Sequence, residues 1–280
     1  MAQPTLSCPV AGWRSLADWQ RDRDGVLHAE QPAIDAALAD GGVEGRCDAC
    51  GHRGRFALVD AAALREGLPC PRCRCNARQR AAARLLLSTL AGPAAARVYL
   101  TEQASPLFIA LRRRVGRLVG SEFARGPLRR LRLSAWLWRQ RVPAWVRHQD
   151  ITALRMRPAS LDAVVSLDVL EHVPDYAAGL RGFVRVLRPG GVLVLTVPFY
   201  ECDDAHRQIA RLGPDGGLLH DGPAEYHGDP LGGGVPCFHH FGWSLLGALR
   251  EAGFADACMV RVADVGAALP RGQWVVLARR

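Results

Sequence analysis

The segment from Leu161 to Phe199 constrains the fold more than any other part of the chain. Its residues predict a strand, a helix and a second strand, over residues 163–167, 176–187 and 192–197. Both strands are continuous apolar runs, which is typical of parallel strands buried on both faces of a sheet. The helix places Leu180, Phe183 and Leu187 on one face, and a Pro-Gly-Gly turn ends it. The sequence therefore predicts a βαβ unit of an open α/β sheet.

Three polar residues, Asp168, Glu171 and His172, crowd the loop that comes after the first of these strands. In open α/β sheets, ligands bind beyond the carboxyl ends of the strands. These residues are therefore candidates for a binding or catalytic site. The loop reads DVLEHV, and the end of the helix with the second strand reads VLRPGGVLVLTVP.

This pattern resembles the class I S-adenosylmethionine-dependent methyltransferases, and among them the type 11 methyltransferases. The resemblance implies a Rossmann-like, doubly wound α/β fold with a mostly parallel seven-stranded sheet. It also implies S-adenosyl-L-methionine as the cofactor and methyl transfer to an oxygen or nitrogen acceptor. On this basis Leu167 and Asp168 are expected at the cofactor site.

The first half of such a fold is predicted over residues 97–123, with a strand, a loop at 101–106, a helix over 107–115 and a second strand. The loop contains no glycine, although the family loop is usually glycine-rich because the backbone approaches the cofactor closely. VYLTEQASP and LVGSEF look like a subgroup of these enzymes with a glycine-free loop. The resemblance implies that Thr101, Glu102 and Gln103 hold the methionine end of the cofactor.

Two further acids are expected to contact the cofactor. Glu122 lies about 20 residues beyond the loop, where a carboxylate can accept hydrogen bonds from both ribose hydroxyls. In the family pattern, an acid at the position of Asp150 lies beside the adenine and accepts a bond from its exocyclic amine.

Five of the nine cysteines cluster between residues 47 and 75. Two Cys-x-x-Cys pairs provide four thiolates suited to a tetrahedral structural zinc site, at Cys47, Cys50, Cys70 and Cys73. Buried reduced cysteines are the main alternative, and a redox pair is disfavoured because no βαβ unit frames the motif. Cys75 is a substitute ligand or, more simply, a bystander. A helix over residues 76–90 comes directly after the second pair.

These features divide the chain into three parts: an extended or partly helical arm over 1–45, a zinc-ribbon-like module with its helix over 46–92, and a methyltransferase domain over 93–280. Two insertions interrupt the last part. Residues 126–147 are rich in Arg and Trp and predict a surface helix or lid, or alternatively a patch that contacts a membrane interface. Residues 200–242 are a loop-rich insertion that is expected to shape the acceptor pocket.

The acceptor-side insertion concentrates histidines and acids, namely His206, His220, His227, His239, His240, Asp221, Glu225 and Asp229. They indicate a second metal site or a general base, or alternatively hydrogen bonds that fix the loop. His172 and His227 are the candidates for a catalytic base, although His172 can instead cap its loop. A helix over 244–252 and two antiparallel strands are predicted to complete the sheet.

The net charge is +9 and the isoelectric point is near 9.5, which leaves open a nucleic-acid partner or an anionic surface. An RNA methyltransferase and a non-catalytic zinc-containing scaffold are therefore alternatives. A small-molecule or glycan acceptor ranks above them, because the resembling proteins are commonly associated with sugar modification. No apolar run reaches the roughly 20 residues of a membrane span, and the N-terminus lacks the features of a signal peptide, so a cytoplasmic location is expected.

Overall fold

The computed structural model describes residues 12–228 and 234–280, so Asp229 and the first residues of the predicted arm lie outside the described residues. Six helices are described, at α1 (Leu16–Ala39), α2 (Ala77–Thr89), α3 (Pro106–Leu111), α4 (Pro127–Arg139), α5 (Tyr176–Val186) and α6 (Leu245–Ala252). The strands of the central sheet are β3 (Arg97–Leu100), β4 (Arg117–Gly120), β5 (Leu161–Leu167), β6 (Leu187–Thr196), β13 (Asp256–Asp264) and β14 (Leu269–Arg279).

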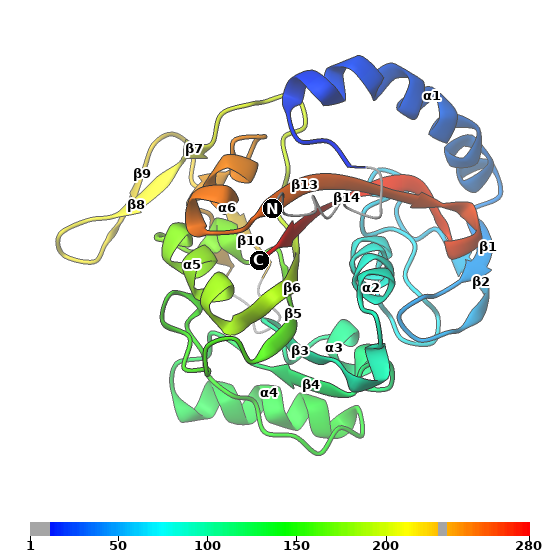
Figure 1. The fold of residues 1–280 in the computed structure, drawn as a ribbon. Coiled ribbons are helices and arrows are strands. Elements are labelled where there is room, and N and C mark those ends of the chain that lie inside the picture. The colour runs from blue at the N-terminus through cyan, green and yellow to red at the C-terminus, as the bar shows by residue number, and fades with distance from the viewer. Residues whose placement is uncertain (1–11, 229–233) are drawn as a thin grey trace, which may run out of the picture.

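The central sheet has the order β13-β14-β6-β5-β3-β4 (Figure 1). The strands β4, β3, β5 and β6 are parallel, whereas β14 and β13 pair antiparallel at the far edge. One buried cluster packs α2, α3 and α4 on one face, and a second packs α5 and α6 on the other. The predicted Rossmann-like, doubly wound fold is therefore confirmed.

The prediction of seven strands is wrong, because the sheet has six strands within the described residues. The segment that returns alongside β4 makes a single parallel bridge, between Glu122 and His148. Its polar groups are satisfied by a side chain instead, since Gln103 donates to the carbonyl of Trp145 and accepts from the amide of Arg147. These bonds take backbone groups that a seventh strand would need.

The remaining strands form short two-stranded pairs outside the central sheet. The N-terminal hairpin is β1 (Gly42–Arg46) with β2 (Arg53–Ala57). The others lie in the acceptor-side insertion, at β7 (Arg207–Gln208), β8 (Ala210–Leu212), β9 (Leu218–His220), β10 (Tyr226–His227), β11 (Val235–Pro236) and β12 (His239–His240). The helix predicted over 107–115 ends early, because α3 stops at Leu111 and turns come after it.

The predicted arm is mostly one long helix, α1, which begins at the N-cap Ser15 and arches over β13 and β14 (Figure 1). Its fully buried Trp19 packs edge-on against Trp274 of β14. Its Glu30 forms a two-pronged ion pair with Arg261 of β13, with N···O distances of 2.7 and 2.8 Å. The sequence did not indicate this helix clearly, because its apolar residues do not form one continuous stripe.

Replacing Glu30 by alanine is expected to lower the free energy of unfolding by about 3–5 kcal/mol, because it removes both short hydrogen bonds to the buried guanidinium of Arg261 and leaves the longer contact with Glu201, at 3.5 Å, in their place. The amide of Gly272 also loses its acceptor. Chemical denaturation measures the change, and Asp35→Ala, on an exposed position of the same helix, is the control. A loss below about 1 kcal/mol, as for an exposed ion pair, would contradict the expectation.

Candidate cofactor and acceptor site

The carboxyl ends of β3, β4 and β5 bring three predicted acids to one place. Glu102 lies just after β3, Glu122 just after β4 and Asp168 just after β5. Burial raises the pKa of Glu102 to about 8; Arg78 opposes this rise, while the negative charges of Glu122 and Asp168 add to it. The three acids therefore act on one another and line a single region.

The glycine-free loop is held by hydrogen bonds rather than by unusual backbone angles, since none of residues 101–106 has a positive φ. The amide of Ala104 donates to Oε1 of Glu122 at 2.6 Å, which ties the loop to the end of β4. Ser105 Oγ donates to the carbonyl of Glu102, and Thr101 Oγ1 donates to Ser166 Oγ. Glycine is therefore not required by this loop conformation.

Other residues predicted at the site have structural contacts. The side-chain amide of Gln103 is engaged with the 145–147 segment. Oδ1 of Asp150 accepts from both the amide and the hydroxyl of Thr152, as the N-cap of a short 3-10 turn. Leu167 is buried at the end of β5.

Asp168 is held in a strained backbone conformation by several partners. Its φ is +50°, a value that non-glycine residues rarely adopt and that is enriched at functional sites. Thr196 donates to Oδ1 at 2.8 Å, and Arg65 donates to both carboxylate oxygens at 2.8 Å. Burial alone raises the pKa of Asp168, but Arg78 and Arg65 outweigh it and hold that pKa below its usual range.

Arg65 and Arg78 are functional candidates that the sequence reasoning missed. Arg65 comes from the loop before the second cysteine pair, and Arg78 from the first turn of α2. One buried atom of each of two neighbouring side chains has no hydrogen-bond partner: the donor Nη1 of Arg78 and the acceptor Oε1 of Glu102. The only available signal was an arginine in the first helical turn, where acids are favoured over bases.

The raised pKa of Glu102 predicts a pH-dependent stability. Between pH 4.5 and about 8 the folded chain keeps a proton that the unfolded chain has lost, so stability falls as the pH rises through this window, by up to about 1.4 kcal/mol per pH unit. We expect Glu102→Gln to make the profile less steep, with a gain over wild type that grows with pH, while Glu171, whose pKa burial also raises to about 8, keeps its own share of the slope. Melting curves from pH 5 to about 9 measure it, with exposed Glu44→Gln as the control; parallel profiles would reject the assignment.

The four cysteines predicted to bind metal converge on one point. Their sulfur atoms lie within 4.8 Å of one another, and the Cys47–Cys73 and Cys50–Cys70 pairs are each 3.7 Å apart. Zn–S bonds of about 2.3 Å place tetrahedral ligands about 3.8 Å apart, so the cluster fits zinc.

The two cysteine turns have the same backbone geometry. In the first, Gly51 has a φ of +76° and its amide donates to the carbonyl of Cys47; in the second, Arg74 has a φ of +66° and its amide donates to Cys70. Cys75 thus occupies the position that His52 has in the first turn, outside the four-sulfur cluster.

Arg80 joins this module to the central sheet. Its buried guanidinium donates to the carbonyls of Leu68, Ala267 and Ala268. It also lies over the ring of Phe56, with 4.5 Å to the ring centroid. Burial lowers the pKa of Arg80, and negative charge on the nearby cysteines Cys47, Cys70, Cys73 and Cys75 opposes this effect.

The predicted histidines of the acceptor side separate into two groups, apart from His220, whose buried Nδ1 has no hydrogen-bond partner among the described residues. His206, His239 and His240 are fixed by local hydrogen bonds, to one another, to backbone carbonyls or to Glu225. His172 and His227 instead face each other, with ring centroids 5.0 Å apart. The Nδ1 of His172 donates to the carbonyl of Pro236 at 2.9 Å, so its Nε2 keeps a lone pair.

Glu171 lies beneath these two rings. Its carboxylate is 1% exposed and neither oxygen has a hydrogen-bond partner. Oε1 is 3.8 Å from Nε2 of His172 and 3.7 Å from Nδ1 of His227. Burial lowers the pKa of His172, which therefore is neutral at pH 7 and able to accept a proton.

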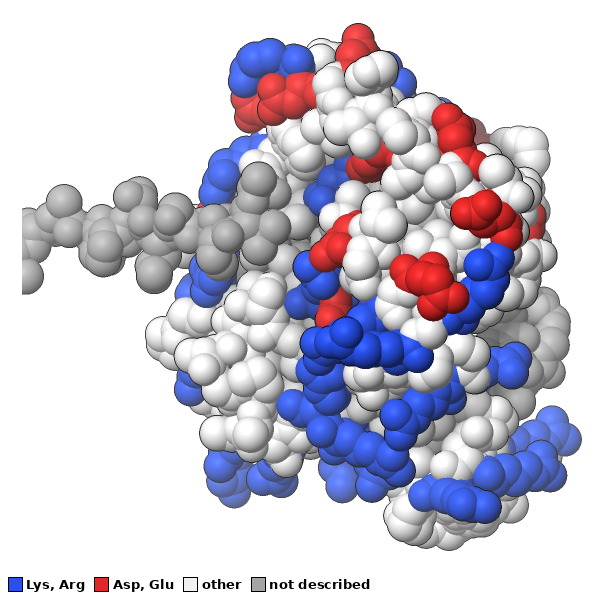
Figure 2. Space-filling view, turned by 90° about the vertical axis from the view of Figure 1, so that its right-hand side faces the viewer, with Lys and Arg blue, Asp and Glu red and all other residues white. Residues whose placement is uncertain are grey.

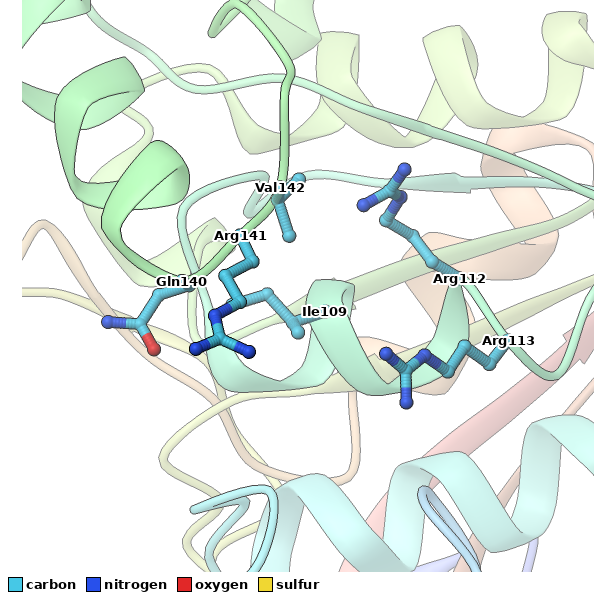
Figure 3. A pocket seen from close by; sticks show the side chains of 6 residues that line it. All are labelled: Ile109, Arg112, Arg113, Gln140, Arg141 and Val142. Carbon is cyan, nitrogen blue, oxygen red and sulfur yellow. The ribbon is translucent and has the colours of Figure 1, made fainter.

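A pocket of about 340 Å³ lies away from this edge, between the far end of α3 and the turn after α4 (Figure 3). Its lining residues are Ile109, Arg112, Arg113, Gln140, Arg141 and Val142. Because α3 begins at the carboxyl ends of the parallel strands and runs back toward the start of β4, this pocket lies near the amino ends of the strands, whereas the acids lie at the carboxyl ends. It is therefore not the predicted cofactor site.

The comparison with protein families matches residues 104–195 to a family described as a methyltransferase domain. Among curated proteins, a probable S-adenosylmethionine-dependent methyltransferase of Mycolicibacterium smegmatis is 42% identical over 53 residues, 19% of this chain and 21% of that protein. The ubiquinone biosynthesis O-methyltransferase of Xanthomonas campestris is 48% identical over 40 residues, 14% of this chain and 17% of that protein. The chain thus spans about a fifth of the length of these relatives.

Among solved structures, an S-adenosylmethionine-dependent methyltransferase from Mesorhizobium loti is similar, with 20% identity and a TM-score of 0.47 over 71% of this chain and 98% of that chain. In the part of the chain that the structure describes, no helix has both the length and the apolar character needed to cross a membrane.

Proposed function

We propose that this chain uses S-adenosyl-L-methionine to methylate an oxygen or nitrogen atom of a small molecule or glycan. The match of residues 104–195 to a methyltransferase domain supports the reaction class. The local similarity to a protein named as an O-methyltransferase supports an oxygen acceptor. The assignment of a glycan or another small molecule as the acceptor rests only on the family resemblance of the sequence.

The observation that carries the proposal is a pair of buried side-chain atoms without hydrogen-bond partners, Oε1 of Glu102 and Nη1 of Arg78. The methionine end of the cofactor bears one ammonium and one carboxylate. Oε1 of Glu102 is a buried acceptor and Nη1 of Arg78 is a buried cationic donor, and neither atom has a hydrogen-bond partner, so they complement these two groups. The residues present therefore fit the cofactor, with Thr101 and Gln103 shaping the same loop.

The remaining acids complete the proposed cofactor site. Glu122 accepts hydrogen bonds from the ribose hydroxyls, and Asp150 accepts one from the adenine amine. Leu167 and Asp168 border the cofactor at the end of β5. Arg65 pairs with Asp168 and is partly exposed, so its guanidinium would be available to the cofactor carboxylate.

The bound cofactor supplies an activated methyl group on a sulfonium, so the protein mainly aligns the acceptor with the methyl–sulfur bond. His172 and His227 are placed to activate the acceptor. The Nε2 lone pair of His172 takes the proton of an acceptor hydroxyl, and His227 stands 5.0 Å away, ring centroid to centroid, on the partly exposed side. Oε1 of Glu171 lies 3.8 Å from the nitrogen that takes up this proton.

Isothermal calorimetry with S-adenosylmethionine tests the proposal. Wild-type protein is expected to bind one equivalent, and Ala104→Trp is expected to bind none, because the indole fills the loop side of the site. Ala62→Trp, in an exposed loop of the cysteine module, is the matched control and should bind normally. No binding by wild type up to millimolar cofactor would reject the enzyme and favour a scaffold.

An RNA acceptor is the second candidate, favoured by the arginine-rich face in Figure 2. Methyl transfer to RNA rather than to small acceptors in an assay with radiolabelled cofactor would select it.

A further inference from the structure

We propose that His172, His227 and Cys237, together with Glu171, form a second metal site that binds a divalent transition cation such as zinc. One nitrogen of each histidine and the sulfur of Cys237 lie within 4.8 Å of one another. This cluster lies on the acceptor side and shares no residue with the four-cysteine module. Its binding of metal does not depend on methyl transfer.

The distances between Glu171 and the histidines suit a shared cation better than hydrogen bonds. Oε1 of Glu171 is 3.8 Å from Nε2 of His172 and 3.7 Å from Nδ1 of His227. These oxygen–nitrogen gaps are too long for hydrogen bonds. Zinc bonds of about 2.0–2.3 Å place neighbouring ligand atoms about 3.3–3.8 Å apart, so small side-chain rotations complete the site.

Glu171 gives an independent sign of a missing ligand. Its carboxyl group is 1% exposed and neither oxygen has a hydrogen-bond partner, whereas buried polar groups are normally hydrogen-bonded, paired or bound to a metal. No arginine donates to it in the part of the chain that the structure describes, since Arg65 and Arg78 are engaged with Asp168. A cation between the histidines would give this carboxyl group a partner.

The surroundings also match those of known metal ligands. The Nδ1–H of His172 is bound to the carbonyl of Pro236, which fixes the ring and directs Nε2 toward the cluster. Two imidazoles, a thiolate and a carboxylate favour zinc, iron or cobalt over magnesium or calcium. His227 is partly exposed, so the cluster is open to solvent for metal entry and for an acceptor.

The role in the reaction, unlike the binding, rests on the proposed function. With a cation bound, the imidazoles of His172 and His227 are metal ligands. The cation then activates an acceptor hydroxyl by lowering its pKa, in place of proton abstraction by His172.

The test is zinc content, measured by elemental analysis after equilibration with zinc and removal of loosely bound metal. Cys237→Ser and His227→Ala are each expected to hold one zinc fewer per chain than wild type. Their matched controls from the same insertion are Cys202→Ser, at an exposed position, and His220→Ala, at a partly buried one, and both should keep the wild-type content. Cobalt substitution gives a second readout, because the loss of one thiolate ligand weakens the sulfur-to-cobalt absorption.

Equal zinc content in wild type and Cys237→Ser, with folding confirmed by circular dichroism, would overturn the site. The count requires neither cofactor nor acceptor. A failed second metal site therefore leaves the calorimetric test of cofactor binding unaffected, and the reverse also holds.

A second inference rests on a different surface. We infer that α4 and the turn after it dock on an anionic lipid bilayer. Residues 103–149 contain 11 of the 36 arginines and one of the 27 acidic residues, Glu122. This segment has a net charge of +10, which leaves −1 for the rest of the chain. Figure 2 shows one face of the molecule on which such basic side chains gather in the lower half.

The same segment exposes apolar side chains along one line of the helix. Leu128, Leu131 and Trp138 of α4 are exposed, at spacings of three and seven residues. Trp145 packs edge-on against Trp138 and is 63% exposed. Arginines beside an apolar, tryptophan-containing stripe are typical of helices that lie in a membrane interface. Leucines in this stripe favour a bilayer over RNA, which is bound by aromatic stacking.

Arg141 adds a strained residue to this surface. It occupies the position after α4 that usually carries glycine, with a φ of +60°, and its amide donates to the carbonyl of Trp138. Its side chain lies at the 340 Å³ pocket with those of Arg112 and Arg113 (Figure 3). Three guanidiniums around one pocket suit a lipid phosphate.

Co-sedimentation with phosphatidylcholine vesicles, with and without phosphatidylglycerol, tests this surface. We expect binding only to the anionic vesicles, weakened by salt and by Leu128→Ser/Leu131→Ser. Arg141→Gly should weaken binding while raising the melting temperature, because glycine relieves the positive φ. Arg74→Gly, at a similar φ in the second cysteine turn, should raise the melting temperature alone. Absence of vesicle binding, or binding to single-stranded RNA instead, would overturn the inference.

Discussion

Cys70→Ser is expected to remove one zinc per chain and to unfold the N-terminal module. The binding free energy of structural zinc in such sites, about 10–16 kcal/mol in peptides, appears as folding free energy. The loss should extend into the sheet, because Arg80 and Leu68 of this module are buried in the same core as β14. Elemental analysis and thermal melting measure both effects.

Cys75→Ser is the matched control for this change. Cys75 is as buried as Cys70 and lies five residues away, but it stands outside the four-sulfur cluster. The Cys75→Ser variant should therefore keep the zinc and most of the stability of wild type. The zinc assignment fails if Cys70→Ser retains the metal content of wild type.

The unfolded module would also affect the proposed cofactor site. Arg65 lies between the two cysteine pairs, and Arg78 comes shortly after the second one. Both reach Asp168, which is 90 or more positions further along the chain. A zinc-free variant should consequently lose cofactor affinity even where the sheet itself stays folded, which makes the module part of the site rather than an appendage.

The features that could be predicted from the sequence are local ones. The β5–α5–β6 unit is specified by periodicity within 40 residues, and the capping box of Asn76 and Gln79 starts α2 where the sequence predicts a helix. The four-cysteine cluster is specified by two short spacings. In each case the residues that specify the structure are close together in the chain.

The features that could not be predicted depend on contacts between distant segments. The pairing of Glu30 with Arg261 joins residues 231 positions apart, so α1 looks polar until its partner strand is known. The missing seventh strand depends on Gln103 bonding to the 145–147 segment. The unpartnered carboxylate of Glu171 likewise becomes visible only when the insertion folds back over its loop.

Among substitutions that remove a proposed cofactor contact, the largest effect on binding is expected from Glu122→Ala, with a loss of affinity of at least about tenfold. The change removes acceptors for two ribose hydroxyls, each worth about 1.5–3 kcal/mol as a bond to a charged group, and about 1.4 kcal/mol corresponds to a factor of ten. It also removes the acceptor of the Ala104 amide, which would loosen the cofactor loop. Glu122→Gln separates these effects, because its amide oxygen still accepts from Ala104 while the negative charge is lost. We expect calorimetry to rank wild type above Glu122→Gln and Glu122→Ala last, with both variants folded by circular dichroism. If all three proteins bind the cofactor equally, Glu122 holds the loop alone and the ribose lies elsewhere.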